Sequence, residues 1–250
     1  MGYVNNPAQR LEYVLNELRN FPAKKNASTN YTIADAIASK FTEGDVSTPV
    51  LTRMVADIAE LPGKAAAAIS AANADDYYLQ WKGPVDAAIG MLSNLGHPVA
   101  VIANHVDEAS MMNLGAAVRQ VVAGAPVDDG AEIAELASEL EALYEAICGA
   151  SLPEALATFL CDQVDRMRVA LRDFRIVGSD GITDAADAAV GAVLRARGLF
   201  PDDLGADESR GFAKQVFVLA GKLGEFAGKA GAVIALSEKA YEALMALPPS

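Results

Sequence analysis

The sequence predicts an all-α protein, an elongated multi-helix bundle of about nine or ten helices. Two observations predict this fold class. Alanine, the residue type with the highest helix propensity, supplies 49 of the 250 residues. Apolar residues recur at spacings of three and four along most of the chain, which is typical of helices with one buried face. Because 52% of the residues are hydrophobic, the chain can also bury a sizeable core.

The charges divide the chain into two regions. Acidic residues outnumber basic ones by 33 to 20, which makes the net charge -13. Residues 1–82 hold 8 basic and 9 acidic side chains, whereas residues 83–250 hold 12 and 24. We therefore expect a near-neutral N-terminal helical region (1–82) and an acidic helical bundle (83–250), which can also form one continuous domain. An acidic surface repels nucleic acid and favours basic partners.

The N-terminal region begins with a capped helix. Asn6 and Pro7 are a typical N-cap and first helical residue, and an apolar stripe follows them. The stripe consists of Leu11, Val14, Leu15 and Leu18. A second helix is expected to begin at the capping box formed by Thr32 and Asp35, and to end near Phe41.

A third helix is expected from Ser47-Thr48-Pro49 to Pro62-Gly63, where proline and glycine predict a break. An alanine-rich helix should then cover residues 64–82. The next helix should end near Leu95, because Gly96-His97-Pro98 interrupts the apolar pattern.

An antiparallel helical hairpin is expected over about 130–176. Its first helix carries an apolar seam at coiled-coil spacing: Ile133, Leu136, Leu140, Leu143 and Ile147. The second helix begins at Ser151-Leu152-Pro153-Glu154 and continues the pattern with Leu160, Val164, Met167, Leu171 and Phe174. A connection this short makes the two helices fold back on each other.

A single long helix is expected over about 207–247. Beside its apolar seam runs a stripe of mostly small residues: Phe217, Gly221, Gly224, Gly228, Gly231 and Ala235. Glycines inside a helix each cost about 0.5–1 kcal/mol relative to alanine, and close approach of another backbone would offset that cost. We therefore expect this stripe to contact a neighbouring helix of the bundle, a second subunit or a partner helix. The alternative is a break near Gly228 that gives two shorter helices joined by a hinge.

The sequence contains no recognisable reaction motif. Neither His97 nor His105 follows an acidic residue by three positions, as di-iron bundles require. Phosphate-binding glycine loops and nucleophile elbows are also missing. Two cysteines, Cys148 and Cys161, make neither a disulfide scaffold nor a zinc site. We expect no metal, cofactor or small-molecule ligand and a non-enzyme, although the abundant Asp and Glu side chains leave an acidic active site open.

From these features we expect a non-catalytic helical subunit that acts in protein–protein interaction or assembly, with a protein partner or a second copy. The N-terminus has no signal peptide, which predicts a cytoplasmic location. One alternative is a membrane-active helical effector that inserts residues 87–127, a weakly charged stretch. The other is a helix-turn-helix DNA-binding protein through residues 32–61, in which Ser47, Thr48 and Arg53 would contact the nucleic acid.

Overall fold

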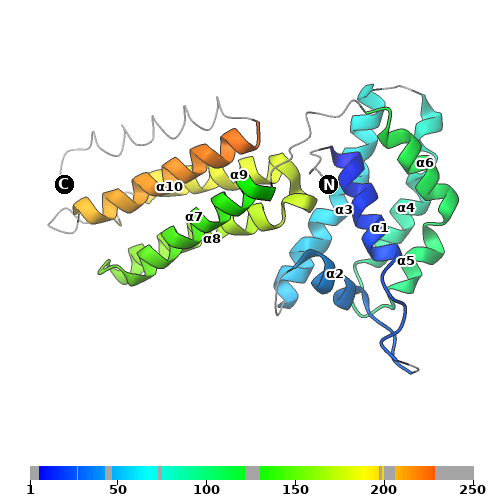
Figure 1. Ribbon diagram of the computed structural model, residues 1–250, viewed down its shortest axis with the longest axis horizontal. Coiled ribbons are helices and arrows are strands. Elements are labelled where there is room, and N and C mark those ends of the chain that lie inside the picture. Colours follow the sequence, from blue (N-terminus) through cyan, green and yellow to red (C-terminus); the bar gives the residue numbers. More distant parts are fainter. Residues whose placement is uncertain are drawn as a thin grey trace. The chain divides into compact units, whose positions relative to one another are not determined.

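The computed structural model describes residues 6–26, 28–42, 47–72, 75–121, 130–196, 199 and 206–228. These residues form ten α-helices and one short 3-10 helix, with isolated β-bridges and no strand (Figure 1). The predicted all-α fold class is confirmed. The chain divides into two compact units, Met1–Asp128 and Asp129–Ser250. The change in net charge at residues 82–83 therefore lies inside the first unit and does not coincide with the boundary between the two units.

Unit 1 is built around the pairing of its first and third α-helices, whose apolar faces pack together. Its elements are α1 (Pro7–Arg19), α2 (Ile33–Phe41), α3 (Thr48–Ala72), η1 (Asp76–Leu79), α4 (Lys82–Met91), α5 (Ala100–His105) and α6 (Glu108–Val118). Trp81, between η1 and α4, is fully buried. The core also holds Leu11, Leu15, Leu18, Met54, Ile58 and Leu61.

The predicted starts of the first two helices are confirmed. Asn6 Oδ1 accepts a hydrogen bond of 2.9 Å from the Ala8 N–H at the start of α1. At the start of α2, Thr32 Oγ1 accepts from the Asp35 N–H, and an Asp35 carboxylate oxygen accepts from the Thr32 N–H. These bonds satisfy helix donors that have no partner within the helix itself.

The predicted break at Pro62-Gly63 is wrong, because α3 continues through both residues to Ala72. Proline lacks an N–H, so the Ile58 carbonyl loses its helical donor. Pro62 is buried with other apolar residues of α3, and that burial offsets the lost bond. The separate helix expected over 64–82 therefore does not form: its first part belongs to α3, and α4 begins at Lys82 with Pro84 in its first turn.

The predicted break at Gly96-His97-Pro98 is confirmed, since α4 ends at Met91 and α5 begins at Ala100. The intervening segment caps α2. Its Leu95 and His97 carbonyls accept hydrogen bonds of 3.0 and 2.9 Å from the N–H groups of Ala34 and Ile33. The stretch 87–127 of the membrane-active alternative is therefore divided among α4, α5 and α6 in this structure.

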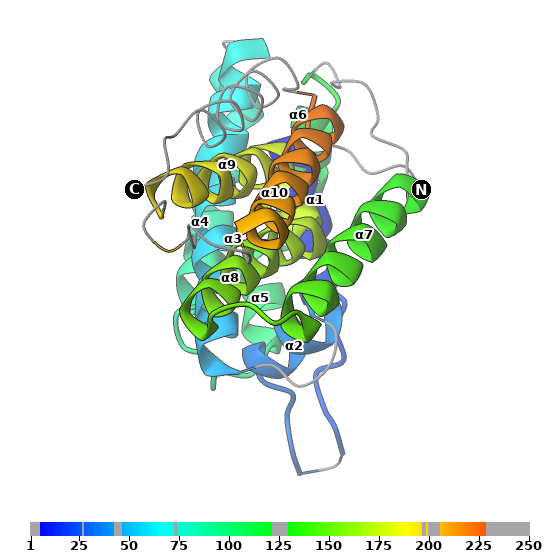
Figure 2. The same ribbon diagram turned by 90° about the vertical axis from the view of Figure 1, so that its left-hand side faces the viewer.

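The described residues of unit 2 form four antiparallel helices: α7 (Gly130–Gly149), α8 (Glu154–Arg172), α9 (Phe174–Arg195) and α10 (Ala206–Phe226). Each neighbours the next, and α10 also packs against α7 (Figures 1 and 2). Phe174 and Phe226, from opposite ends of α9 and α10, stack edge to face with ring centroids 5.2 Å apart. This is the arrangement of an up-and-down four-helix bundle.

The predicted antiparallel hairpin corresponds to α7 and α8, which a short loop joins (Figure 2). Cys148 of α7 contacts Cys161 of α8, and Glu141 of α7 pairs with Arg168 of α8. Glu141 lies seven residues before Cys148, whereas Arg168 lies seven residues after Cys161. The two helices are therefore antiparallel. The seam residues from Leu136 to Ile147 and from Leu160 to Leu171 are buried as expected.

Two glycines shape α9 near its start. Gly178 has φ 67° and ψ −167°, which kinks the helix. The helix resumes directly after the kink, and the Thr183 hydroxyl donates a hydrogen bond to the Ser179 carbonyl one turn earlier. A Cβ at Gly181 would lie 2.4 Å from the Val177 Cβ, so only glycine fits there.

The predicted single helix over 207–247 is wrong, because α10 ends at Phe226. The Ala227 and Gly228 N–H groups bond to the Leu223 and Glu225 carbonyls, and Gly228 adopts φ 71°. Glycine in this left-handed conformation is a common helix terminator. Residues 229–250 lie outside the described residues.

Replacing Gly181 by alanine should destabilise unit 2, because the new methyl group would overlap Val177. We expect Gly181→Ala to lower the free energy of unfolding by about 1–3 kcal/mol. The matched control is Gly211→Ala in α10, where an added Cβ meets nothing within 4 Å. That variant should be more stable by about 0.5–1 kcal/mol. Urea unfolding followed by circular dichroism measures both, and equal effects of the two variants would contradict the packing described.

Candidate functional site

The described part of the small-residue stripe predicted on the C-terminal helix is mostly buried. Phe217, Gly221 and Gly224 are buried. Gly228 is exposed beyond the end of α10, and a Cβ there would meet none of the described residues within 4 Å. The last two residues of the predicted stripe, Gly231 and Ala235, lie outside the described residues.

The outward face of α10 is a different set of residues. Lys214, Gln215, Val218 and Lys222 are exposed on it. Val218 is 50% exposed, which makes it one of four large apolar side chains recorded as exposed in the described part of the chain. Single exposed apolar side chains are normal on protein surfaces, so Val218 is of interest because of the groove that it borders rather than because of its exposure.

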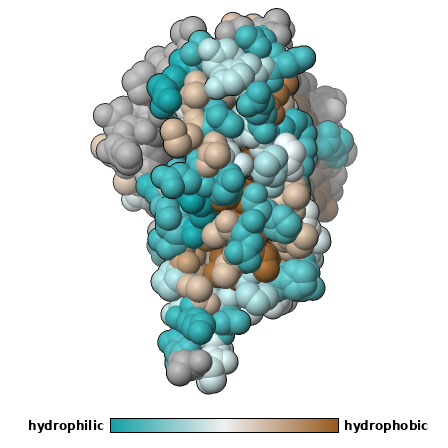
Figure 3. All heavy atoms as spheres, turned by 90° about the vertical axis from the view of Figure 1, so that its right-hand side faces the viewer, coloured by the Kyte–Doolittle hydropathy of each residue, from teal (hydrophilic) through white to brown (hydrophobic). Residues whose placement is uncertain are grey.

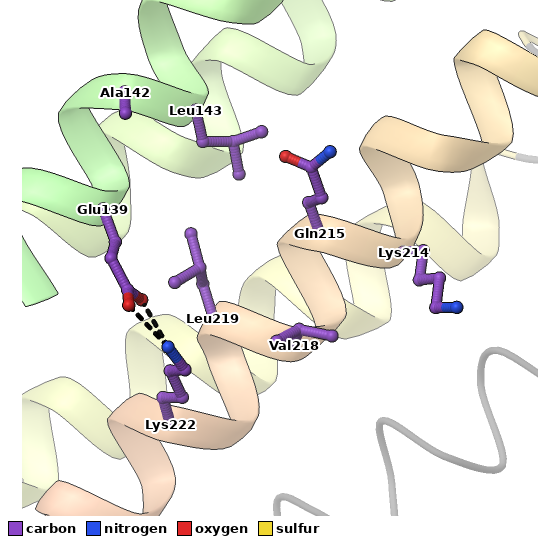
Figure 4. Close-up of a pocket in the computed structure, with 8 residues that line it drawn as sticks. All are labelled: Glu139, Ala142, Leu143, Lys214, Gln215, Val218, Leu219 and Lys222. Carbon is purple, nitrogen blue, oxygen red and sulfur yellow. Dashed lines mark hydrogen bonds and ion pairs between the residues drawn. The ribbon is translucent and has the colours of Figure 1, made fainter.

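These residues border a groove of about 390 Å³ between α7 and α10 (Figure 4). Its walls are formed by Glu139, Ala142 and Leu143 of α7 and by Lys214, Gln215, Val218, Leu219 and Lys222 of α10. Leu143 and Leu219 point toward each other across the space and form its apolar floor (Figure 4). Both leucines also belong to the bundle core, being 3% and 6% exposed.

An ion pair closes one end of the groove. Lys222 Nζ lies 2.6 and 2.7 Å from the two carboxylate oxygens of Glu139 (Figure 4). The two side chains are 45% and 32% exposed, so water screens the pair. Such a pair contributes little stability. It joins the side chain of Glu139 on α7 to that of Lys222 on α10 at this end of the groove.

The α7 wall continues past this ion pair as an acidic stripe. Glu132, Glu135 and Glu139 follow one another at spacings of three and four, and Ala142 and Ala146 extend the same line. Helix α7 carries five glutamates and no basic residue. Glu132 and Glu135 are exposed and form no recorded ion pair with any described residue. The groove therefore has an apolar floor and a strongly acidic extension.

Sequence reasoning missed this groove. Val216 to Leu219 is a continuous apolar run, so periodicity alone does not reveal that Val218 faces outward while its neighbours are buried. The glutamate stripe of α7 was readable from the sequence, but its position beside α10 depends on how the bundle closes.

The three residues of the DNA-binding alternative lie at the start of α3. Ser47 precedes this helix, Thr48 is its first residue, and both are exposed together with Arg53. The only other basic residue of α3 is Lys64, which pairs with Glu60 at 2.7 Å. The helix carries as many acidic as basic side chains, so it has no positive stripe of the kind that phosphate contacts require.

Unit 1 offers less than unit 2 as an interaction surface. The face of unit 1 shown in Figure 3 is mostly polar, with apolar side chains in small patches between the polar ones. Tyr77 and Met112 are 56% and 68% exposed, but scattered exposed side chains of this kind are common on protein surfaces.

Glu12 of α1 is a carboxyl group with a perturbed pKa. Burial raises its pKa, and the positive charge of Arg119 partly opposes that rise. The carboxylate packs against the α6 backbone, since a Cβ at Gly115 would lie 2.9 Å from Glu12 Oε1. Raised carboxyl pKa values also occur in catalytic sites, but this one is explained by the packing of α1 on α6.

Among the described residues, no cluster of three or more His, Cys, Asp or Glu side chains is suited to hold a metal ion. None of the described helices combines the length and the apolar character needed to cross a membrane.

Comparison of the chain with protein-family models, curated proteins and solved structures finds no match. The groove between α7 and α10 therefore has to be interpreted from its own geometry and charge.

Two substitutions in the groove should separate packing from charge. Leu219→Ala should lower the free energy of unfolding by about 2–3 kcal/mol, because it removes a buried side chain. Lys222→Ala should lower it by less than about 1 kcal/mol, because the ion pair is half-exposed. Urea unfolding tests both, and a larger loss for Lys222→Ala would show that the ion pair, rather than the leucines, holds α7 to α10.

Glu12→Gln should stabilise the protein at neutral pH. A folded-state pKa above the unfolded value of 4.5 means that folding favours the protonated carboxyl, so the ionised form is unfavourable above that pH. The neutral amide of glutamine removes the cost of holding an ionised carboxylate at this partly buried position. Thermal unfolding at several pH values should therefore show Glu12→Gln gaining stability relative to the wild type as pH rises through the carboxyl titration. A difference independent of pH would be inconsistent with this origin.

Proposed function

We propose that this protein is a non-catalytic helical interaction subunit whose groove between α7 and α10 binds a basic amphipathic helix of a partner protein. The observation that carries the proposal is the apolar floor of Leu143 and Leu219, bordered by the half-exposed Val218 and continued by the glutamates of α7. An amphipathic helix binds such a groove through apolar residues spaced at three and four.

Charge supports a basic partner over a second copy of this chain. Unit 2 carries 20 acidic and 11 basic side chains. Two copies meeting at this groove would bring together two bundles of the same net negative charge, which opposes association. Lysine or arginine at one end of a partner helix would instead lie beside Glu132 and Glu135, which gives the partner a preferred orientation.

The proposal is tested with two synthetic helical peptides. Both carry leucines at positions i, i+3, i+4 and i+7, one with lysines and the other with glutamates at the remaining positions. Fluorescence anisotropy should detect binding of the lysine peptide, with an affinity that falls as salt is raised. Val218→Asp and Glu135→Lys should each weaken this binding by about tenfold or more.

Met112→Asp is the matched control, because Met112 is an exposed apolar side chain on α6 of unit 1. It should leave peptide binding unchanged. Equal binding of both peptides, or an equal loss in Met112→Asp, would count against the groove. Light scattering of the whole chain should give the mass of a monomer. A dimer that dissociates in Val218→Asp would show instead that a second copy of the chain occupies the groove.

A further inference from the structure

The two cysteines of unit 2 lie in contact across the helical hairpin. Cys148 Sγ on α7 and Cys161 Sγ on α8 are 3.2 Å apart. Both are free thiols, with Cys148 exposed and Cys161 partly buried. The sequence predicts neither a disulfide scaffold nor a zinc site from these two cysteines, because nothing in their local surroundings indicates that they meet.

The hairpin holds the thiols opposite each other. Each cysteine directly follows a buried seam residue, Ile147 on α7 and Leu160 on α8. Seven residues from each cysteine, Glu141 pairs with Arg168, so the same register extends along the interface. A disulfide has an S–S distance of about 2.05 Å, so the sulfur atoms need to approach by only about 1.2 Å more. Side-chain rotation on two adjacent helices can supply a movement of this size.

The two thiols differ in their surroundings. Burial raises the pKa of Cys161 to about 12, and the hydrogen bond with Cys148 adds to the rise. Cys161 therefore stays protonated at neutral pH and reacts slowly with oxidants, because the thiolate is the nucleophile. Cys148 is the exposed member of the pair, so an oxidant in solution reaches it first.

We propose that Cys148 and Cys161 form a redox site, a dithiol that a hydroperoxide converts into an intramolecular disulfide. The Cys148 sulfur attacks the terminal peroxide oxygen, the S–O bond forms as the O–O bond breaks, and the Cys148 proton leaves with the other oxygen as an alcohol or water. The Cys161 sulfur then attacks the resulting sulfenic acid at Cys148, the S–O bond breaks, and water leaves with the Cys161 proton. Two thiols and one hydroperoxide thus give one disulfide, and a dithiol reductant reverses the reaction by thiol–disulfide exchange.

The disulfide would join the last turn of α7 to the eighth residue of α8. It would restrict the unfolded chain and fix the hairpin against opening. This site does not depend on the groove between α7 and α10, because it lies at the α7–α8 contact.

The experiment treats the reduced whole chain with hydrogen peroxide. We expect both thiols to disappear together, the mass to fall by two hydrogen atoms, and the product to remain a monomer. A peptide containing Cys148 should be found linked to one containing Cys161. The oxidised protein should unfold at a temperature higher by roughly 5–10 °C, and dithiothreitol should restore the original value.

Two variants keep the test specific. Cys161→Ala leaves only Cys148, which should be oxidised to the sulfinic acid or to an intermolecular dimer. Combining Cys148→Ala with Ala146→Cys keeps two thiols per chain, but a shift of two residues turns the first thiol by about 200° around α7. That variant should form no intramolecular disulfide under the same conditions.

Three results would overturn the proposal. The first is survival of both thiols at a peroxide concentration that oxidises Cys148 in Cys161→Ala. The second is a wild-type product made only of intermolecular dimers or sulfinic acids. The third is equally rapid intramolecular closure in the Ala146→Cys variant.

Discussion

The packing of α7 against α8 is the constraint on which unit 2 depends. Leucine and isoleucine side chains at coiled-coil spacing on α7 meet a matching row on α8, and both rows are buried. Each fully buried side chain of this kind contributes about 1.5–3 kcal/mol, so the row as a whole outweighs any of the exposed ion pairs around it. Only one register buries both rows, and the contacts of Cys148 with Cys161 and of Glu141 with Arg168 are consequences of that register.

Helix α7 takes part in both proposed sites through different faces. Its contact with α8 brings the two thiols together, and its contact with α10 forms the groove. Leu143 belongs to the buried seam and also reaches the groove floor. Because the helix is rigid, the packing of its buried residues also fixes the positions of its exposed residues.

Unit 1 shows how tertiary contacts override local sequence signals. Pro62 lies inside α3, although proline normally ends a helix, because its ring is buried in the core. The segment between α4 and α5 lacks helical structure, yet its carbonyls accept hydrogen bonds from the first N–H groups of α2. Residues far apart in the sequence thus satisfy the unpaired groups at a helix end, which a local pattern cannot indicate.

The sequence by itself determined the helical fold class, the caps at Asn6 and Thr32, and the hairpin of α7 and α8. These features depend on residues within one or two helical turns, or on a short loop between two apolar stripes. Tertiary structure decided the burial of Gly221 and Gly224 and the outward position of Val218. It also decided the meeting of Cys148 with Cys161. Each of these depends on which neighbouring helix covers a given face, and a continuous apolar run or an isolated cysteine carries no information about its neighbours.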